Sequence, residues 1–119
     1  MLGLVLVTHA PLGDAIAQCV KHVMGSLPDG LAVVDVPGDE DIEQSVQRIQ
    51  TAARQVHAGE GVVFLTDLFG ATPSNAAVRA GVESLNLPTV LVSGCNLPMV
   101  LRALGFRDLP INEVAERLV

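Results

Sequence analysis

The sequence predicts a doubly wound α/β fold, a three-layer α/β/α domain around a central, mainly parallel four-stranded sheet in the order 2-1-3-4. Short apolar runs typical of buried strands alternate with stretches of helical periodicity. The runs begin about 30 residues apart, which is the length of one strand-plus-helix unit. Half of the residues are hydrophobic and only 3% are aromatic, a balance that suits aliphatic strands covered by helices on both faces.

Four segments are predicted as strands because each is short, rich in Val and Leu, and closed by polar or turn-forming residues. They comprise residues 4–9, 31–36, 62–67 and 89–93. Apolar residues spaced by three and four predict helices over residues 12–24, 42–57, 72–85, 97–105 and 110–118. Thr72 suits the N-cap of the third helix with Pro73 at its first position, and Asn96 suits the N-cap of the fourth.

Length and composition restrict the class of protein. A chain of 119 residues is expected to form a single domain, residues 1–119. The net charge of −6 and the scattered basic residues argue against binding to nucleic acid. Mean hydropathy is high, at +0.47, but no apolar run approaches the ~20 residues of a membrane span, and no signal peptide is recognisable. We therefore expect a cytoplasmic protein in which Cys19 and Cys95 are reduced and buried.

Polar side chains close three of the four predicted strands. His9 follows Thr8 at the end of the first, Asp67 ends the third, and Ser93 ends the fourth. Ligands and chemistry collect where the carboxyl ends of parallel strands meet. If the first and third strands are neighbours, His9 and Asp67 meet at the point where the strand order reverses.

A carboxylate beside a histidine fixes the ring tautomer and leaves the other nitrogen free as a nucleophile. The helix starts that follow these strands present unpaired N–H groups that favour an anion. This combination fits phosphoryl transfer to imidazole. Neither a Walker A motif nor G-x-G-x-x-G is present, so nothing suggests a bound nucleotide, and the phosphoryl group has to arrive on another protein or a small donor. In this interpretation we expect no cofactor and no metal.

Two other interpretations of these residues, neither of which involves phosphoryl transfer, stay open at this point. His9 and Asp67 can form a purely structural pair at the sheet edge. Alternatively, His9, Asp67 and Cys95 can form a small-ligand or metal-binding module, since imidazole, carboxylate and thiolate are all metal ligands.

Three motifs resemble the IIA component of the mannose-family sugar phosphotransferase system. They are Thr8-His9, then Asp67-x-x-Gly70-x-x-Pro73-x-Asn75-Ala76, then Gly94-x-Asn96-x-Pro98-Met99. The resemblance covers nearly the whole chain. It implies a phosphotransferase in which His9 accepts a phosphoryl group from the carrier protein HPr and passes it to a IIB partner, in sugar transport or in a regulatory relay. It further implies that Asp67 orients His9 and that the phosphate is held by Thr8, Gly70, Ala71, Thr72 and Ser74.

The sequence departs from the family pattern in three places. Ala10 stands where the family usually has Gly, and Gly70-Ala71-Thr72 replaces the usual Gly-Gly-Ser. The sequence also ends at Val119, before the segment through which members often exchange a strand, so a homodimer of that kind is not expected although other homodimers stay open. A second phosphocarrier with a similar N-terminal histidine, the phosphotransfer subunit of dihydroxyacetone kinase, is the alternative within the class.

Apolar turn residues that can form a docking rim around His9 are Leu12, Leu68, Phe69, Leu97 and Met99.

Overall fold

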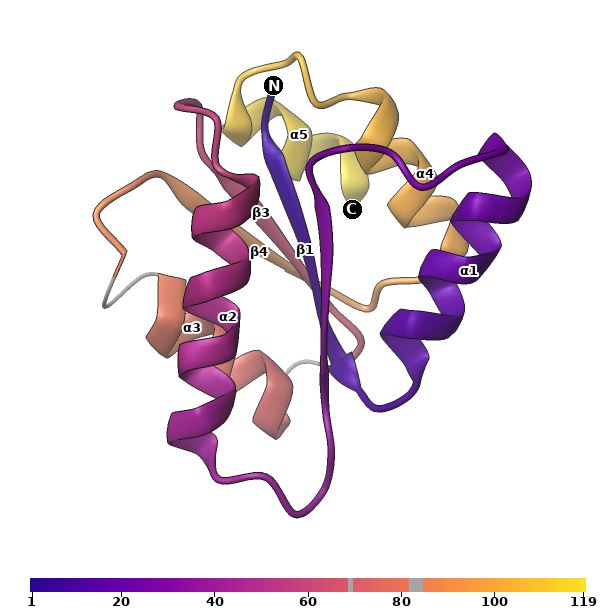
Figure 1. Cartoon of the computed structure of the whole chain (residues 1–119). Helices are drawn as coiled ribbons and strands as arrows, with labels where there is room; N and C mark the ends of the chain where they lie inside the picture. The colour runs from indigo at the N-terminus through magenta and orange to yellow at the C-terminus, as the bar shows by residue number, and fades with distance from the viewer. Residues whose placement is uncertain (69, 82–84) are drawn as a thin grey trace.

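The protein is organised around a four-stranded sheet, seen in a computed structural model that describes residues 1–68, 70–81 and 85–119. All strand pairs are parallel and the order is β2-β1-β3-β4, as predicted (Figure 1). The strands are β1 (Gly3–His9), β2 (Leu31–Val36), β3 (Val62–Thr66) and β4 (Thr89–Ser93). Because β1 lies between β2 and β3, its carboxyl end is flanked by the ends of both neighbours.

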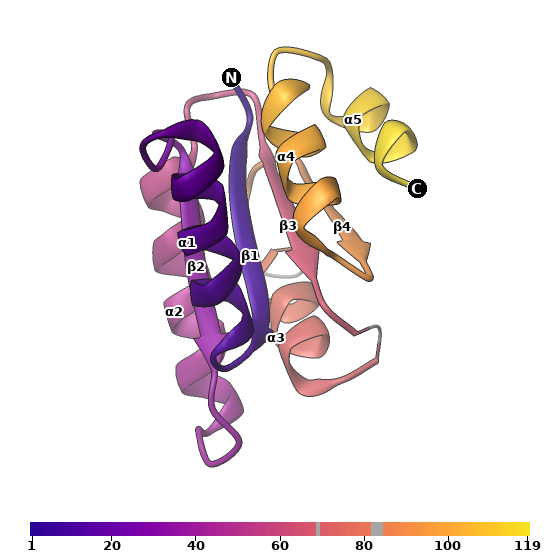
Figure 2. The ribbon, with the colours of Figure 1, turned by 90° about the vertical axis from the view of Figure 1, so that its right-hand side faces the viewer.

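Helices cover both faces of the sheet, which confirms the three-layer prediction. They are α1 (Leu12–Met24), α2 (Ile42–Val56), α3 (Thr72–Gly81), α4 (Leu97–Gly105) and α5 (Ile111–Leu118). Figure 2 shows α4 and α5 together near β3 and β4, with α1 beside them, whereas α2 and α3 lie behind the sheet. In the part of the chain that the structure describes, each of the five predicted helices therefore corresponds to an observed helix.

Alternation along β1 divides the apolar interior into two cores. Leu4 and Leu6 pack in the core beneath α1, α4 and α5, whereas Val5 and Val7 pack in the core beneath α2 and α3. Side chains of a strand point alternately to opposite faces. His9 therefore continues the face of Val5 and Val7, on the side of the sheet that α3 covers.

The apolar stripe of α1 is only partly buried, and this corrects one expectation. Helix α1 buries Gly13, Ile16, Ala17 and Val20. Cys19 is free and exposed rather than buried, because the packed face of the helix is centred on Ala17 and Val20. Cys95 is free and buried, as expected.

The N-cap of α3 lies one residue earlier than predicted. The Asn75 N–H donates to the Ala71 carbonyl at 3.0 Å, so Ala71 occupies the N-cap position and Thr72 lies in the first turn. The Asn75 amide donates in turn to the Gly70 carbonyl at 3.3 Å, which holds the preceding loop against the helix. Phe69 and the predicted last turn, residues 82–84, fall outside the described residues.

Polar side chains cap the starts of two other helices. Asn96 caps α4, since its Oδ1 accepts from the Met99 N–H at 2.9 Å, as predicted. Asp41 occupies the N-cap of α2. Within the described part of the chain, no helix has the length and apolar content needed to cross a membrane.

Candidate active site

His9 and Asp67 meet at the carboxyl edge of the sheet, as the strand order predicts. The His9 Nδ1 lies 2.9 Å from Asp67 Oδ2, and the same oxygen accepts from the His9 backbone N–H at 3.0 Å. Half of the His9 side chain is exposed, at 50%, whereas the Asp67 side chain is 13% exposed. One carboxylate oxygen thus holds both the ring and the backbone of a residue that faces solvent.

The charge of Asp67 fixes the tautomer of His9. Partial burial by itself raises the pKa of this carboxyl, but the hydrogen bonds from the His9 ring and backbone N–H outweigh it and leave the pKa below its usual value. Asp67 is therefore ionised near neutral pH and can only accept, so Nδ1 carries the proton. The lone pair of the neutral ring then resides on Nε2.

The loop after Asp67 and the start of α3 form the second part of the site. Gly70 and Thr72 are exposed and Ala71 is half-buried, whereas Ser74 is 2% exposed. No acceptor among the described residues takes the backbone N–H of Thr72. The first turn of α3 therefore offers an unpaired donor at the positive end of a helix, on the face of the sheet to which His9 belongs.

Thr8 lies away from this surface. Its side chain is fully buried, and its hydroxyl donates to Asp35 Oδ1 at 2.6 Å. Thr8 adjoins His9 in sequence, but alternation directs it to the opposite face of the sheet, beneath α1. The resemblance implied a phosphate contact for Thr8, and in the structure its hydroxyl donates to the half-buried Asp35.

Asp35 is the residue of this edge that sequence reasoning missed. Its Oδ1 also accepts from the Gly13 N–H at 2.8 Å, and its Oδ2 accepts from the Asp14 N–H at 2.9 Å. A signal was present, because Asp35 is the single charged residue in an otherwise apolar strand, one residue before its end. Only the pairing of Asp35 beside Thr8 in the sheet reveals its partners.

The polar end of β4 lies next to that of β3 without joining the His9 pair. The Thr66 hydroxyl donates to Ser93 Oγ at 3.2 Å, and the Cys95 N–H donates to the Thr66 carbonyl at 2.9 Å. Burial, reinforced by the nearby negative charge of Asp67, raises the pKa of the Cys95 thiol to about 11. A thiol that stays protonated is a poor metal ligand. Among the described residues, no three His, Cys, Asp or Glu side chains are grouped to hold a metal.

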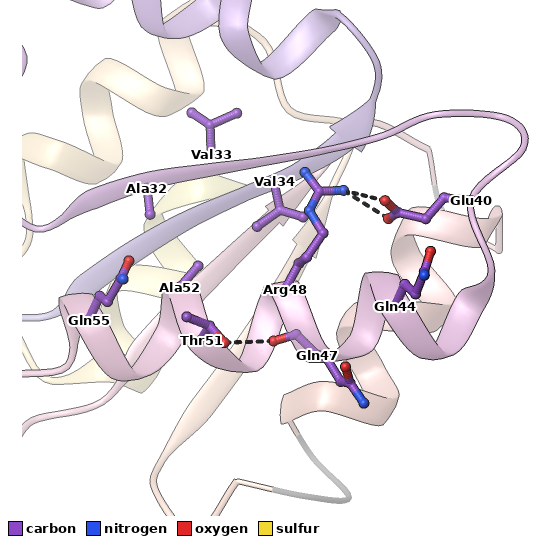
Figure 3. A pocket seen from close by; sticks show the side chains of 10 residues that line it. All are labelled: Ala32, Val33, Val34, Glu40, Gln44, Gln47, Arg48, Thr51, Ala52 and Gln55. Atoms are coloured by element: carbon purple, nitrogen blue, oxygen red, sulfur yellow. Dashed lines mark hydrogen bonds and ion pairs between the residues drawn. The ribbon is translucent and has the colours of Figure 1, made fainter.

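The exposed setting of His9 differs from that of a small-molecule pocket. A shallow depression of about 590 Å³ lies between β2 and α2, where Arg48 points toward Glu40 (Figure 3). Neither His9 nor Asp67 lines it. A half-exposed ring at an open edge suits contact with another macromolecule.

The fold and the site together define a class of protein: a parallel α/β domain that presents an exposed histidine, oriented by a carboxylate, at the carboxyl edge of its sheet. Comparison with known proteins specifies the class. The sequence profile of the family described as "PTS system fructose IIA component" matches residues 3–118. The chain therefore belongs to the EIIA family of the mannose/fructose-type sugar phosphotransferase system.

Individual relatives agree with this assignment. The chain is 27% identical over 108 residues to the fructose-specific EIIA component of Bacillus subtilis, which covers 91% of this chain and 72% of that protein. It is 26% identical over 107 residues to the mannose-specific EIIAB component of Escherichia coli, covering 90% of this chain. The matched part is 32% of that protein, so the chain spans about a third of its length.

A solved structure confirms the fold. The crystal structure of a phosphotransferase system component EIIA from Streptococcus agalactiae superposes with a TM-score of 0.81 at 21% identity, covering 99% of this chain and 89% of that one. The family assignment favours the mannose/fructose type over the alternative of a dihydroxyacetone kinase subunit.

Proposed function

We propose that the chain is a phosphohistidine carrier of a phosphoenolpyruvate-dependent sugar phosphotransferase system. In this proposal His9 accepts a phosphoryl group from phosphohistidine on HPr, in the cytoplasm, and passes it to a histidine of a IIB partner. The observation that carries the proposal is the half-exposed imidazole whose Nδ1 is bound by Asp67 at 2.9 Å. Such a ring presents Nε2 to an incoming donor.

The transfer balances without a cofactor. The Nε2 lone pair of His9 attacks phosphorus, the N–P bond of the donor phosphohistidine breaks, and its electron pair returns to the donor imidazole. The new N–P bond leaves the His9 ring with positive character. Asp67 stabilises that charge while it holds Nδ1–H, in the way that a carboxylate orients a catalytic histidine elsewhere.

The start of α3 is the proposed seat of the phosphoryl oxygens. Of the helices that begin near this edge, α1 has its Gly13 and Asp14 N–H groups bound by the Asp35 side chain, and α4 has its Met99 N–H bound by the Asn96 side chain. In α3, no side chain among the described residues accepts from the N–H groups of Thr72 and Ser74. We assign phosphate contact to Gly70, Ala71 and Thr72, with Ser74 buried in the same turn as support.

The experiment is labelling by the complete relay. Incubation of the full chain with phosphoenolpyruvate, Enzyme I and HPr is expected to add a single acid-labile phosphate, detected by intact mass. The variant His9→Gln is expected to take up none. His22→Gln is the matched control, because His22 is an exposed histidine on α1 outside the site, and it is expected to label like the wild type. An unlabelled wild-type chain, or a labelled His9→Gln variant, overturns the proposal.

A further inference from the structure

Asp35 binds both ends of the short segment that carries His9. Its Oδ1 accepts from the Thr8 hydroxyl at 2.6 Å and from the Gly13 N–H at 2.8 Å. Residues 9–12 lie between these two donors. A single carboxylate oxygen therefore closes the turn that leaves β1 at His9 and enters α1. Hydrogen bonds to an ionised acceptor are shorter and stronger than neutral ones.

The closure depends on an unusually near approach of helix to strand. A Cβ on Gly13 would lie 2.5 Å from Thr8 Oγ1 and 2.7 Å from Asp35 Oδ1, so no other residue fits without displacement of that oxygen pair. Pro11 precedes α1 and supplies no side-chain acceptor to it. Asp35 provides that acceptor from another strand, with Oδ2 taking the Asp14 N–H.

The position of Asp35 is itself fixed from the side away from His9. The Asp35 carbonyl accepts from Arg48 Nη1 at 3.0 Å, and the same nitrogen pairs with the Glu40 carboxylate at 2.8 Å and 2.9 Å (Figure 3). Next to it, the Ala10 N–H donates to the Val36 carbonyl at 3.1 Å. The end of β2 is thus held to α2 on one side and to the His9 turn on the other.

We infer that Asp35 is a positioning residue for phosphoryl transfer, which sets the place of the His9 ring through the Thr8 hydroxyl and the start of α1. Two carboxylates then hold His9 in different ways: Asp67 binds its ring, and Asp35 fixes the backbone from which the ring projects. This assignment rests on the proposed function of His9. A small displacement of a reacting group from its productive geometry lowers the rate strongly even when the contact lies outside the chemistry.

The test compares transfer from phosphorylated HPr to full-length variants, with rates expressed per folded molecule. Asp35→Asn and Thr8→Val are each expected to lower kcat about tenfold, with KM for the donor changed by less than about twofold. Thr8→Ser keeps the hydroxyl and is expected to recover wild-type kcat. Asp41→Asn is the matched control, because it changes an N-cap aspartate of α2 in the same way, and it is expected to leave kcat unchanged.

The outcomes separate this assignment from the proposed function. A purely structural cap lowers the folded fraction and leaves kcat per folded molecule unchanged, and that result for Asp35→Asn and Thr8→Val overturns the assignment. If Asp35→Asn does not fold, the Thr8→Val and Thr8→Ser pair decides, and equal kcat for the two overturns it. A wild-type chain that takes up no phosphate overturns the proposed function, and this assignment with it.

Discussion

Asp67 Oδ2 accepts two hydrogen bonds from the same residue, one from the ring and one from the backbone of His9. This pair of bonds restricts both the rotation of the imidazole and the position of its Cα. The second oxygen, Oδ1, is buried without a hydrogen-bond partner among the described residues. A buried carboxylate with an unpaired oxygen carries a desolvation cost, so this oxygen of Asp67 is not expected to stabilise the fold.

Replacement of Asp67 tests whether this residue orients His9 rather than stabilising the fold. Asp67→Ala is expected to keep the fold and to slow phosphoryl acceptance by at least about tenfold, because the ring loses its orienting partner. The measurement is the transfer rate from phosphorylated HPr, with chemical denaturation to verify the folded state. Asp39→Ala, which removes an exposed aspartate in the loop before α2, is the control and is expected to transfer at the wild-type rate. An Asp67→Ala variant with an unchanged rate contradicts the orienting role.

The meeting of His9 and Asp67 could be predicted from the sequence because both close strands that are neighbours in the sheet. The hydrogen-bond partner of the Thr8 hydroxyl could not be predicted. Whether a hydroxyl before His9 faces the edge or the interior depends on the alternation of β1 and on the pairing of Thr8 with Asp35. Neither pattern is visible in a strand that is apolar on both faces.

At the scale of elements, the helix starts differ in how their N–H groups are satisfied, and that difference distinguishes α3. Sequence signals located the capping residue of α4 correctly, since Asn96 precedes Leu97 and Pro98 directly. They placed the N-cap of α3 one residue late, because the Ala71 carbonyl and the Asn75 side chain close the first turn there. Backbone closure of this kind leaves no mark in the residue types.

Two glycines, each the last residue of a helix, give a matched test of how closely a helix packs against the sheet. A Cβ on Gly81, at the end of α3, would lie 2.8 Å from the Phe64 ring, whereas a Cβ on Gly105, at the end of α4, would meet nothing within 4 Å. Gly81→Ala is therefore expected to lower the free energy of unfolding by about 2 kcal/mol through overpacking.

Gly105→Ala is expected to leave that free energy within about 0.5 kcal/mol of the wild type, because its methyl group meets open space. Urea denaturation of both variants gives the comparison. Equal stability of the two would show that Phe64 and its surroundings yield to the added methyl, and the account of a closely packed α3 would be wrong.

At the scale of the whole molecule, two apolar cores hold β1 between them and leave its carboxyl end at the surface. Of the residues suggested for a docking rim, Leu12 is 40% exposed and Leu68 is 59% exposed. Leu97 and Met99 instead pack against the core beneath α1, α4 and α5. We propose that Leu12 and Leu68 contact the phosphoryl donor, since apolar side chains beside a reactive group favour a modest, reversible interface.

The fold could be predicted from the sequence because strand and helix patterns alternate without interruption, and this alternation permits few topologies. The division of apolar residues between core and surface was less predictable. Leu12 and Val23 belong to the apolar pattern of α1, yet both are exposed because the packed face, centred on Ala17 and Val20, covers only one side of that stripe. Periodicity defines an apolar face, but the neighbouring elements decide how much of it is covered.

The nitrogen of His9 that carries the phosphoryl group can be identified directly. The chain carrying ¹⁵N-labelled histidine is phosphorylated through Enzyme I and HPr, and long-range ¹H–¹⁵N correlation spectra assign the nitrogen that carries phosphorus. Because Asp67 binds Nδ1 at 2.9 Å, we predict phosphate on Nε2 of His9. Phosphate on Nδ1 of His9, or on His22 or His57, would contradict it.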